Sequence, residues 1–344
     1  MASHETQNLE LKNILAAVSQ LKIGGNAPFF DGEFSGGECR VFKLSFKDQA
    51  SVAIRVPHPT ENSSYDDTIA IVQAEVRILQ TLEAKGFFWA PRCRGASLTF
   101  DNPVKRPFIV LTWVEGFPLI WDKDFPPRPL RDTVLRQIAS IQLSLITCTL
   151  ENRSITATAF FERRLKNRRT QVRDGKIPCL SEQDCLDQQA LLHRVLGLDR
   201  NSTVFAIDHG DIKPGNIIVD EEYNIKCLID WGFAAMVPIA RAAILPRFLW
   251  PDDSATIAPS LTVLKDRQAY ISSFSSQTSQ AALSMLRWQD AEDVDFRTLY
   301  LDSLSSKGAH TSMARVRWKL SYCEFLGDAE EHSVMGRQLE MLDA

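Results

Sequence analysis

The 344-residue sequence contains no apolar run of the roughly 18 residues that a membrane-spanning helix requires. Its first residues also lack the basic and then apolar pattern of a secretory signal peptide. We find no internal repeat and no low-complexity tract. These absences predict a soluble globular protein that does not have a membrane as its partner.

Paired cysteines and an excess of one charge are missing too. The seven cysteines are scattered and none forms a Cys-x-x-Cys pair, which is typical of a reduced protein and predicts a cytoplasmic one. The 39 basic and 43 acidic residues nearly balance, with a net charge of −4. Such a balance gives no general attraction to polyanions, so we expect no nucleic acid as a partner.

The most informative stretch spans residues 204–233. Two apolar runs flank a polar loop there, which predicts a strand, a loop, a second strand and a turn. The loop carries Asp211 and, five positions later, Asn216, and Asp230 ends the last apolar run. Two carboxylates and an amide oxygen can hold a hard cation and accept a proton from an attacking group.

The sequence of this stretch is similar to that of a known family. It reads His-Gly-Asp-Ile-Lys-Pro-Gly-Asn from residue 209 and Ile-Asp-Trp-Gly from residue 229. This resembles the aminoglycoside phosphotransferase and choline kinase-like enzymes, with residues 178–240 most similar to the fungal members. Protein kinases usually have His-Arg-Asp and Asp-Phe-Gly instead. The alternative is a tight turn at His209 and a strand-end cap at Asp230, but the combined spacings favour the family.

The resemblance implies an α+β protein with the bilobal protein-kinase-like fold. A strand-rich nucleotide-binding lobe would cover residues 1–115, and a mainly helical lobe for catalysis and acceptor binding would cover residues 116–344. Apolar spacings of three and four residues predict the helices. The helices are expected at residues 8–21, 67–84, 130–149, 181–196 and within 260–326. The apolar stripe of the helix at 67–84 is expected to contain Ile71, Ala74, Ile78, Leu79 and Leu82.

In the first lobe the resemblance implies a site for ATP. Gly36 and Gly37 would form the tip of a hairpin over the phosphates, although a Gly-Gly hairpin alone is often only a turn. Arg55 stands where kinases have a lysine, and it can grip phosphate oxygens bidentately. Glu75 would pair with it. The alternatives are an exposed edge-strand arginine and a solvated helix glutamate.

A hinge is expected where the apolar run that begins at Phe108 breaks after residue 114. By analogy with the family, adenine would bond there to the carbonyl of Thr112 and the amide of Val114. Backbone contacts leave no side-chain signature, so this assignment depends on position.

The implied activity is ATP-dependent transfer of the γ-phosphate to a hydroxyl of a small-molecule acceptor. Asp211 would be the base, Asn216 and Asp230 would hold Mg²⁺, and Lys213 would neutralise charge on the transferred group. His209 would brace the loop through hydrogen bonds.

Two other functions remain open at this point. A nucleotide-binding regulator without turnover has only the unusual arginine at position 55 in its favour. A protein kinase is less favoured, because neither Ala-Pro-Glu nor a long polar activation segment follows Asp230. The identity of the acceptor and the oligomeric state have no signature in the sequence.

Two charged segments have less specific interpretations. The basic segment at residues 160–173 is interpreted as a solvated helix face with Phe161, Leu165 and Val172 turned inward. The alternative is a basic patch for an acidic acceptor or a polynucleotide. An acidic cluster in the C-terminal helices is either a solvated face or a site for a cationic acceptor. Its members are Asp290, Glu292, Asp293 and Asp295.

Overall fold

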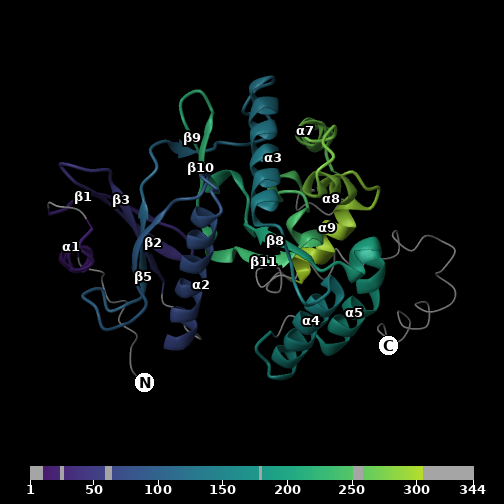
Figure 1. The fold of residues 1–344 in the computed structure, drawn as a ribbon, viewed down its shortest axis with the longest axis horizontal. Coiled ribbons are helices and arrows are strands. Elements are labelled where there is room, and N and C mark those ends of the chain that lie inside the picture. Colours follow the sequence, from purple (N-terminus) through teal and green to yellow (C-terminus); the bar gives the residue numbers. More distant parts are fainter. Residues whose placement is uncertain (1–10, 24–26, 59–63, 178–179, 251–258, 305–344) are drawn as a thin grey trace. The chain divides into compact units, whose positions relative to one another are not determined.

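The computed structural model describes residues 11–23, 27–58, 64–177, 180–250 and 259–304 (Figure 1). Contacts divide the chain into two compact units. Unit 1 consists of residues 1–120 and 210–234, and unit 2 of residues 121–209 and 235–344. The chain therefore returns to unit 1 for the segment with the catalytic-loop pattern, which the sequence did not indicate. The division into a nucleotide-binding lobe and a catalytic lobe near residue 115 remains a prediction.

Unit 1 is built on a five-stranded sheet in which every neighbouring pair is antiparallel. The order is β1-β2-β3-β5-β4. The strands are β1 (Phe29–Ser35), β2 (Cys39–Ser45), β3 (Val52–Pro57), β4 (Cys93–Ser97) and β5 (Phe108–Thr112).

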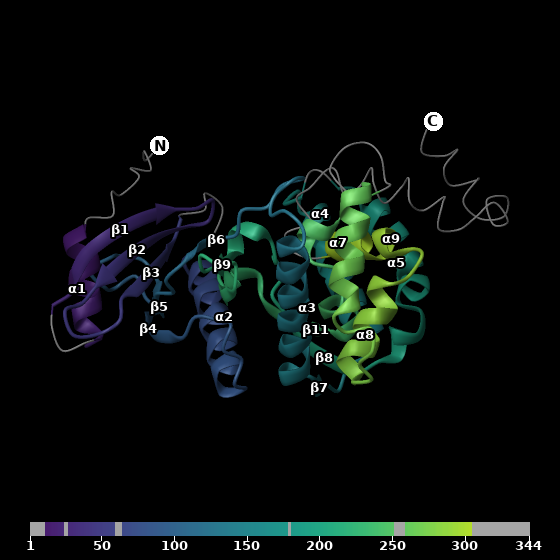
Figure 2. The ribbon, with the colours of Figure 1, turned by 90° about the horizontal axis from the view of Figure 1, so that it is seen from above.

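The two faces of this sheet carry different helices. Because side chains alternate along a strand, Val52 and Ile54 of β3 join a core with Ile14 and Val18 of helix α1 (Leu11–Gln20). Arg55, the residue after Ile54, points to the other face, where helix α2 (Tyr65–Ala84) lies (Figures 1 and 2). The sheet therefore presents a buried arginine to α2.

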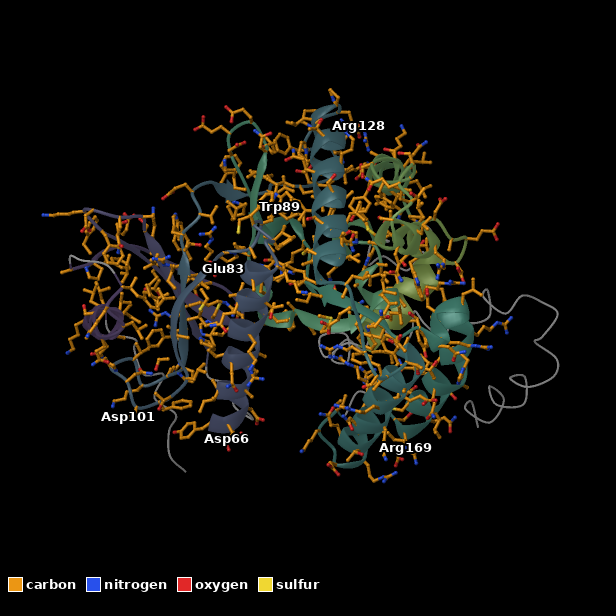
Figure 3. All side chains as sticks on the ribbon, viewed as in Figure 1. Asp66, Glu83, Trp89, Asp101, Arg128 and Arg169 are labelled. Atoms are coloured by element: carbon orange, nitrogen blue, oxygen red, sulfur yellow. The ribbon has the colours of Figure 1, made fainter. Side chains whose placement is uncertain are left out.

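Helix α2 begins with a capping box between Ser64 and Asp67, which satisfies amides of its first turn. Figure 3 labels Asp66 in this first turn and Glu83 in the last turn. The predicted apolar stripe is partly wrong, because Ile71 is 53% exposed. The helix is turned so that Val72, Glu75, Val76, Leu79 and Leu82 are buried. The pairing of Glu75 with Arg55 makes this the inward face.

A smaller sheet in unit 1 supports the catalytic segment. Its order is β10-β9-β6, with β6 (Phe117–Pro118), β9 (Ile217–Val219) and β10 (Ile225–Leu228). Gly116 has a φ of +141°, and a Cβ there would lie 2.4 Å from the carbonyl oxygen of Val219. The close approach of β6 to β9 therefore requires glycine at this position.

Unit 2 combines helices with a three-stranded sheet of order β11-β8-β7. Its strands are β7 (Glu151–Asn152), β8 (Val204–Asp208) and β11 (Ala235–Pro238). Helix α3 (Leu130–Thr149) confirms the prediction for residues 130–149, and α4 (Ala157–Arg173) packs against α5 (Glu182–Leu196) (Figure 1). The remaining helices are α6 (Ile239–Ala242), α7 (Leu261–Ser272), α8 (Gln280–Gln289) and α9 (Val294–Ser303). The part of the predicted helical region at 305–326 lies outside the described residues.

None of the described helices is both long enough and apolar enough to cross a bilayer.

Candidate active site

The loop after β8 holds Asp211 in a fixed position within unit 1. Asp211 is only 2% exposed, and the Nζ of Lys213 donates to its Oδ2 over 2.8 Å. The Nδ2 of Asn216 donates to the carbonyl oxygen of Asp211 over 2.9 Å and to its Oδ2 over 3.3 Å. The amide nitrogen of Asn216 is therefore directed at Asp211, which leaves its amide oxygen for another partner.

Gly210 lets this loop pass against the neighbouring turn. Its φ is +79°, and a Cβ at this residue would lie 2.6 Å from the carbonyl oxygen of Phe233. Any other residue would be strained by its backbone conformation and would also clash. The glycine of the His-Gly-Asp pattern thus has a local structural reason.

Backbone bonds bring Asn216 and Asp230 to neighbouring strand ends. The amide of Ile229 donates to the carbonyl oxygen of Asn216 over 2.9 Å, beside the paired strands β9 and β10. Asp230 follows with a left-handed backbone, φ 66° and ψ 65°. Such a conformation is uncommon outside glycine, and its cost is tolerated where the surrounding structure enforces it, often at functional sites. The two predicted metal ligands therefore lie at the same end of strands β9 and β10.

Aromatic residues that sequence reasoning missed support this turn. Trp231 is 1% exposed, its Nε1 donates to the carbonyl oxygen of Leu228 over 2.7 Å, and its ring packs edge-on against Phe87. The amide of Leu228 donates to the carbonyl oxygen of Trp89 over 2.7 Å. The aromatic run at residues 87–89 was the available signal, but it does not show that these residues contact the distant turn at residues 228–231.

Arg55 joins the β-sheet to the same turn. One of its guanidinium nitrogens forms an ion pair with Glu75, and Nη2 donates to Oδ1 of Asp230 over 2.7 Å. Arg55 is buried, which disagrees with the alternative of an exposed edge-strand arginine. Burial alone would lower the pKa of Arg55, but the carboxylates of Glu75 and Asp230 hold that pKa above its usual value. The guanidinium therefore stays charged.

Two further residues shape the surroundings of Arg55. A Cβ added at Gly232 would lie 3.2 Å from Nη2 of Arg55, so the small residue leaves room for the guanidinium. Cys39, at the start of β2, interacts electrostatically with Arg55. Burial raises the pKa of the Cys39 thiol, and Arg55 opposes this effect. No sequence spacing connects Cys39 with position 55.

The predicted phosphate loop is the hairpin between β1 and β2. The amide of Gly36 donates to the carbonyl oxygen of Cys39 over 2.9 Å, which closes the turn. A Cβ on Gly37 would meet no described atom within 4 Å. The described protein neighbours thus do not require glycine at the tip. That this hairpin covers phosphates remains a prediction.

The predicted hinge residues follow β5. The amide of Thr112 donates to the carbonyl oxygen of Arg92 over 2.9 Å. The amide of Val114 has no hydrogen-bond partner within the part of the chain that the structure describes. Between them, Trp113 stacks on Phe34 with ring centroids 5.4 Å apart. Sequence reasoning missed this aromatic pair, because Phe34 and Trp113 are distant in the sequence.

The donor set is compatible with Mg²⁺. Among the described residues, no three His, Cys, Asp or Glu side chains come together as a metal cage. Mg²⁺ commonly binds through one or two carboxylates together with phosphate oxygens of a substrate, so a full protein cage is not needed. Asp230 and Asn216 would supply a carboxylate and an amide oxygen to such an ion.

The acidic cluster of unit 2 is partly neutralised. Asp295 forms a salt bridge of 2.5 Å with the buried Arg267, and Asp293 one of 2.7 Å with Arg297. The other two members, Asp290 and Glu292, are exposed. Half of the cluster thus serves the packing of its own helices.

Comparison with known protein families identifies the family of this chain. The profile of the phosphotransferase enzyme family matches residues 35–256, which is more than half of the chain. No match was found among curated protein sequences. The chain belongs to the phosphotransferase enzyme family.

Solved structures share its fold. One of them is the ternary complex of streptomycin, ATP and APH(2")-IIa. It has a TM-score of 0.53 at 13% identity, and the match covers 89% of this chain and 96% of that chain. The ADP-bound APH(2'')-Ib has a TM-score of 0.54 at 12% identity, and the match covers 90% of this chain and 96% of that chain. Choline kinase from Cryptosporidium parvum Iowa II has a TM-score of 0.51 at 14% identity, and the match covers 94% of this chain and 92% of that chain. These similarities confirm the α+β protein-kinase-like fold predicted from the sequence.

Proposed function

We propose that this enzyme transfers the γ-phosphate of ATP to a hydroxyl group of a small-molecule acceptor. The observation that carries the proposal is the single cluster in unit 1 of a buried carboxylate, an adjacent lysine, two oxygen ligands and a buried arginine. The family gives the reaction class, and one of its structural neighbours is a complex with ATP. The cluster offers residues for accepting the proton, for holding the metal ion and for binding the phosphates.

Asp211 would orient the acceptor and take its proton. The acceptor oxygen forms a bond to the γ-phosphorus, the bond from that phosphorus to the β-phosphate oxygen breaks, and ADP leaves. Lys213 donates to Oδ2 of Asp211 and is partly exposed, so its charge can face the transferred group. The hydrogen bonds from Lys213 and Asn216 hold the carboxylate in one orientation for this task.

Asn216 and Asp230 would hold Mg²⁺, which when bound neutralises charge on the phosphates. Oδ1 of Asp230 accepts from Arg55, while its Oδ2 has no hydrogen-bond donor among the described residues. Arg55 would grip the phosphates with its fixed fork, held in place by Glu75. Gly36, Gly37, Thr112 and Val114 would contact the rest of the nucleotide.

The acceptor is proposed to be a small molecule, in keeping with the neighbours, whose names include streptomycin and choline. The test is the release of ADP from ATP with Mg²⁺ in the presence of separate panels of small hydroxylated compounds and of peptides. Acceptor-dependent ADP release with small compounds supports the proposal. Tight ATP binding without ADP release in either panel would support a regulator without turnover, and release with peptides alone would support a protein kinase.

A further inference from the structure

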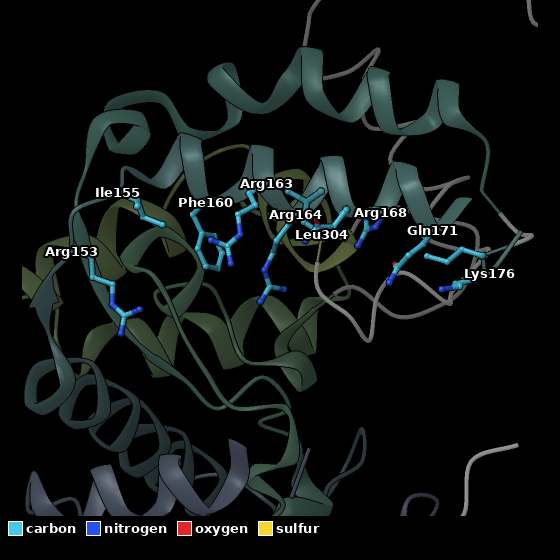
Figure 4. A pocket seen from close by; sticks show the side chains of 11 residues that line it. Arg153, Ile155, Phe160, Arg163, Arg164, Arg168, Gln171, Lys176 and Leu304 are labelled. Atoms are coloured by element: carbon cyan, nitrogen blue, oxygen red, sulfur yellow. The ribbon is translucent and has the colours of Figure 1, made fainter. Parts of the chain in front are cut away.

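Helix α4 of unit 2 borders a cavity of about 580 Å³, and none of the residues proposed for phosphotransfer lines it. This volume lies within the range of about 300–1,000 Å³ that is usual for small-molecule sites. The lining comes from α4, from the segment after β7, from residues 176–177 and from Leu304 at the end of α9 (Figure 4). The cavity is therefore formed by several elements of one unit.

The lining of this cavity has charge of one sign. It contains four arginines and a lysine, and no carboxylate is among its described residues. In Figure 4 the side chains of Arg163 and Arg164 lie on the same side of α4 and extend toward the same region as Arg153. Within the described part of the chain, Arg163, Arg164 and Lys176 take part in no ion pair. Among the described residues, these three cations at the cavity thus have no ion-pair partner.

Two carboxylates on strands β7 and β8 are already paired with arginines. Glu151 accepts from Arg153 over 2.7 Å, and Asp208 lies 3.3 Å from the buried Arg241. Burial, together with the charge of Arg241, lowers the pKa of Arg164. A partly buried cation next to a second cation is costly unless an anion accompanies it. Burial of Arg164 near Arg241 therefore has an energetic cost that a bound anion would offset.

The lining also offers apolar surface. Ile155, Phe160, Ile177 and Leu304 line the same cavity, and the guanidinium of Arg164 lies 5.0 Å from the centre of the Phe160 ring. A ligand that satisfies both parts has an anionic group for the arginines and an apolar body for these side chains. A hollow of this size favours a compact molecule over a polynucleotide, which would need an extended basic groove.

We propose that unit 2 carries a binding site for a small organic anion, a carboxylate or phosphate with an apolar body, in the cavity lined by Arg163, Arg164 and Phe160. The interpretation of α4 as a plain solvated face is correct for only part of the helix. Phe161 and Leu165 are buried as predicted, whereas Val172 is only half-buried. Arg169 and Arg173 pair with Glu182. The remaining arginines of this helix line the cavity.

Calorimetric titration of the full chain with phenyl phosphate tests this site. Benzyl alcohol serves as the neutral probe and phenyltrimethylammonium as the cationic one. We expect only phenyl phosphate to bind, and its affinity to fall at least about tenfold in the double variant Arg163→Gln/Arg164→Gln, since each charge-assisted hydrogen bond contributes about 1.5–3 kcal/mol. Thermal unfolding of each variant confirms that it is folded.

A matched control comes from the same helix. The double variant Arg169→Gln/Arg173→Gln removes the same charge but lies outside the lining (Arg169 is labelled in Figure 3). It should retain the wild-type affinity, as should Asp230→Ala, which alters the proposed metal site of unit 1 and no residue of this lining. The proposal is overturned if phenyl phosphate does not bind, if both double variants weaken it equally, or if Asp230→Ala abolishes it. Tighter binding of a single-stranded RNA oligomer, weakened equally by both double variants, would also overturn it in favour of a nucleic-acid surface.

Discussion

Nη2 of Arg55 lies 2.7 Å from Oδ1 of Asp230, although 175 positions separate the two residues in the chain. The same guanidinium forms an ion pair with Glu75 on α2. One side chain thus connects the main sheet, the helix and the turn that carries a proposed metal ligand. A planar fork with several donors can do this, whereas an ammonium group is a single point charge.

Arg55→Lys should weaken ATP binding about tenfold, because the loss of one charge-assisted hydrogen bond costs roughly 1.5 kcal/mol. Arg55→Gln should also lower the free energy of unfolding by about 3–5 kcal/mol, since it leaves the buried Glu75 without a cation. Calorimetry with ATP and urea unfolding measure the two effects. Wild-type stability of Arg55→Gln would show that the ion pair has no structural role.

Asp211→Asn should reduce turnover by a factor of about 10²–10⁴, the usual contribution of a general base, and leave ATP affinity within about twofold. The amide keeps the shape of the side chain but cannot take the proton. Steady-state kinetics with a true acceptor and calorimetry with ATP separate the two effects. Equal turnover by variant and wild type would refute the role given to Asp211.

Asp230→Ala should make ATP binding insensitive to Mg²⁺, whereas Asn216→Ala should weaken the metal-dependent part less. The carboxylate contributes a full negative charge and the amide only a neutral oxygen. Calorimetric titrations with Mg²⁺ and with a chelator provide the comparison. The prediction fails if the chelator changes the affinity of Asp230→Ala as much as that of the wild type.

Gly210→Ala should destabilise the protein by about 1–3 kcal/mol and reduce turnover, because the left-handed backbone and the carbonyl oxygen of Phe233 both exclude a Cβ. Gly215→Ala in the same loop is the matched control, since a Cβ there meets no described atom within 4 Å. Urea unfolding compares them. Equal stability of the two variants would show that the contact does not constrain the loop.

The sequence was sufficient for the local features and insufficient for the long-range ones. The apolar runs on either side of the polar loop at residues 209–216 predicted the strands and the loop, because a short stretch of chain contains the whole pattern. The rotation of α2 was predicted incorrectly, because Glu75 faces inward only when Arg55 is buried opposite it.

The cavity beside α4 could not be foreseen from periodicity either. Phe161 and Leu165 have the spacing of a buried stripe, and the structure confirms both. Whether Arg163 and Arg164 meet solvent or line a cavity depends on Leu304 and the segment after β7, which are distant in sequence. Apolar periodicity contains no information about such partners.

The most direct test of the proposed function uses ATP whose γ-phosphate carries heavy oxygen. The protein is incubated with this ATP, Mg²⁺ and a metabolite extract, and the products are read by mass spectrometry alongside Asp211→Asn. We predict a small molecule that gains one labelled phosphoryl group with the wild-type protein, and far less of it with the variant. Labelled inorganic phosphate alone, or equal product from both proteins, would contradict the proposed phosphotransfer.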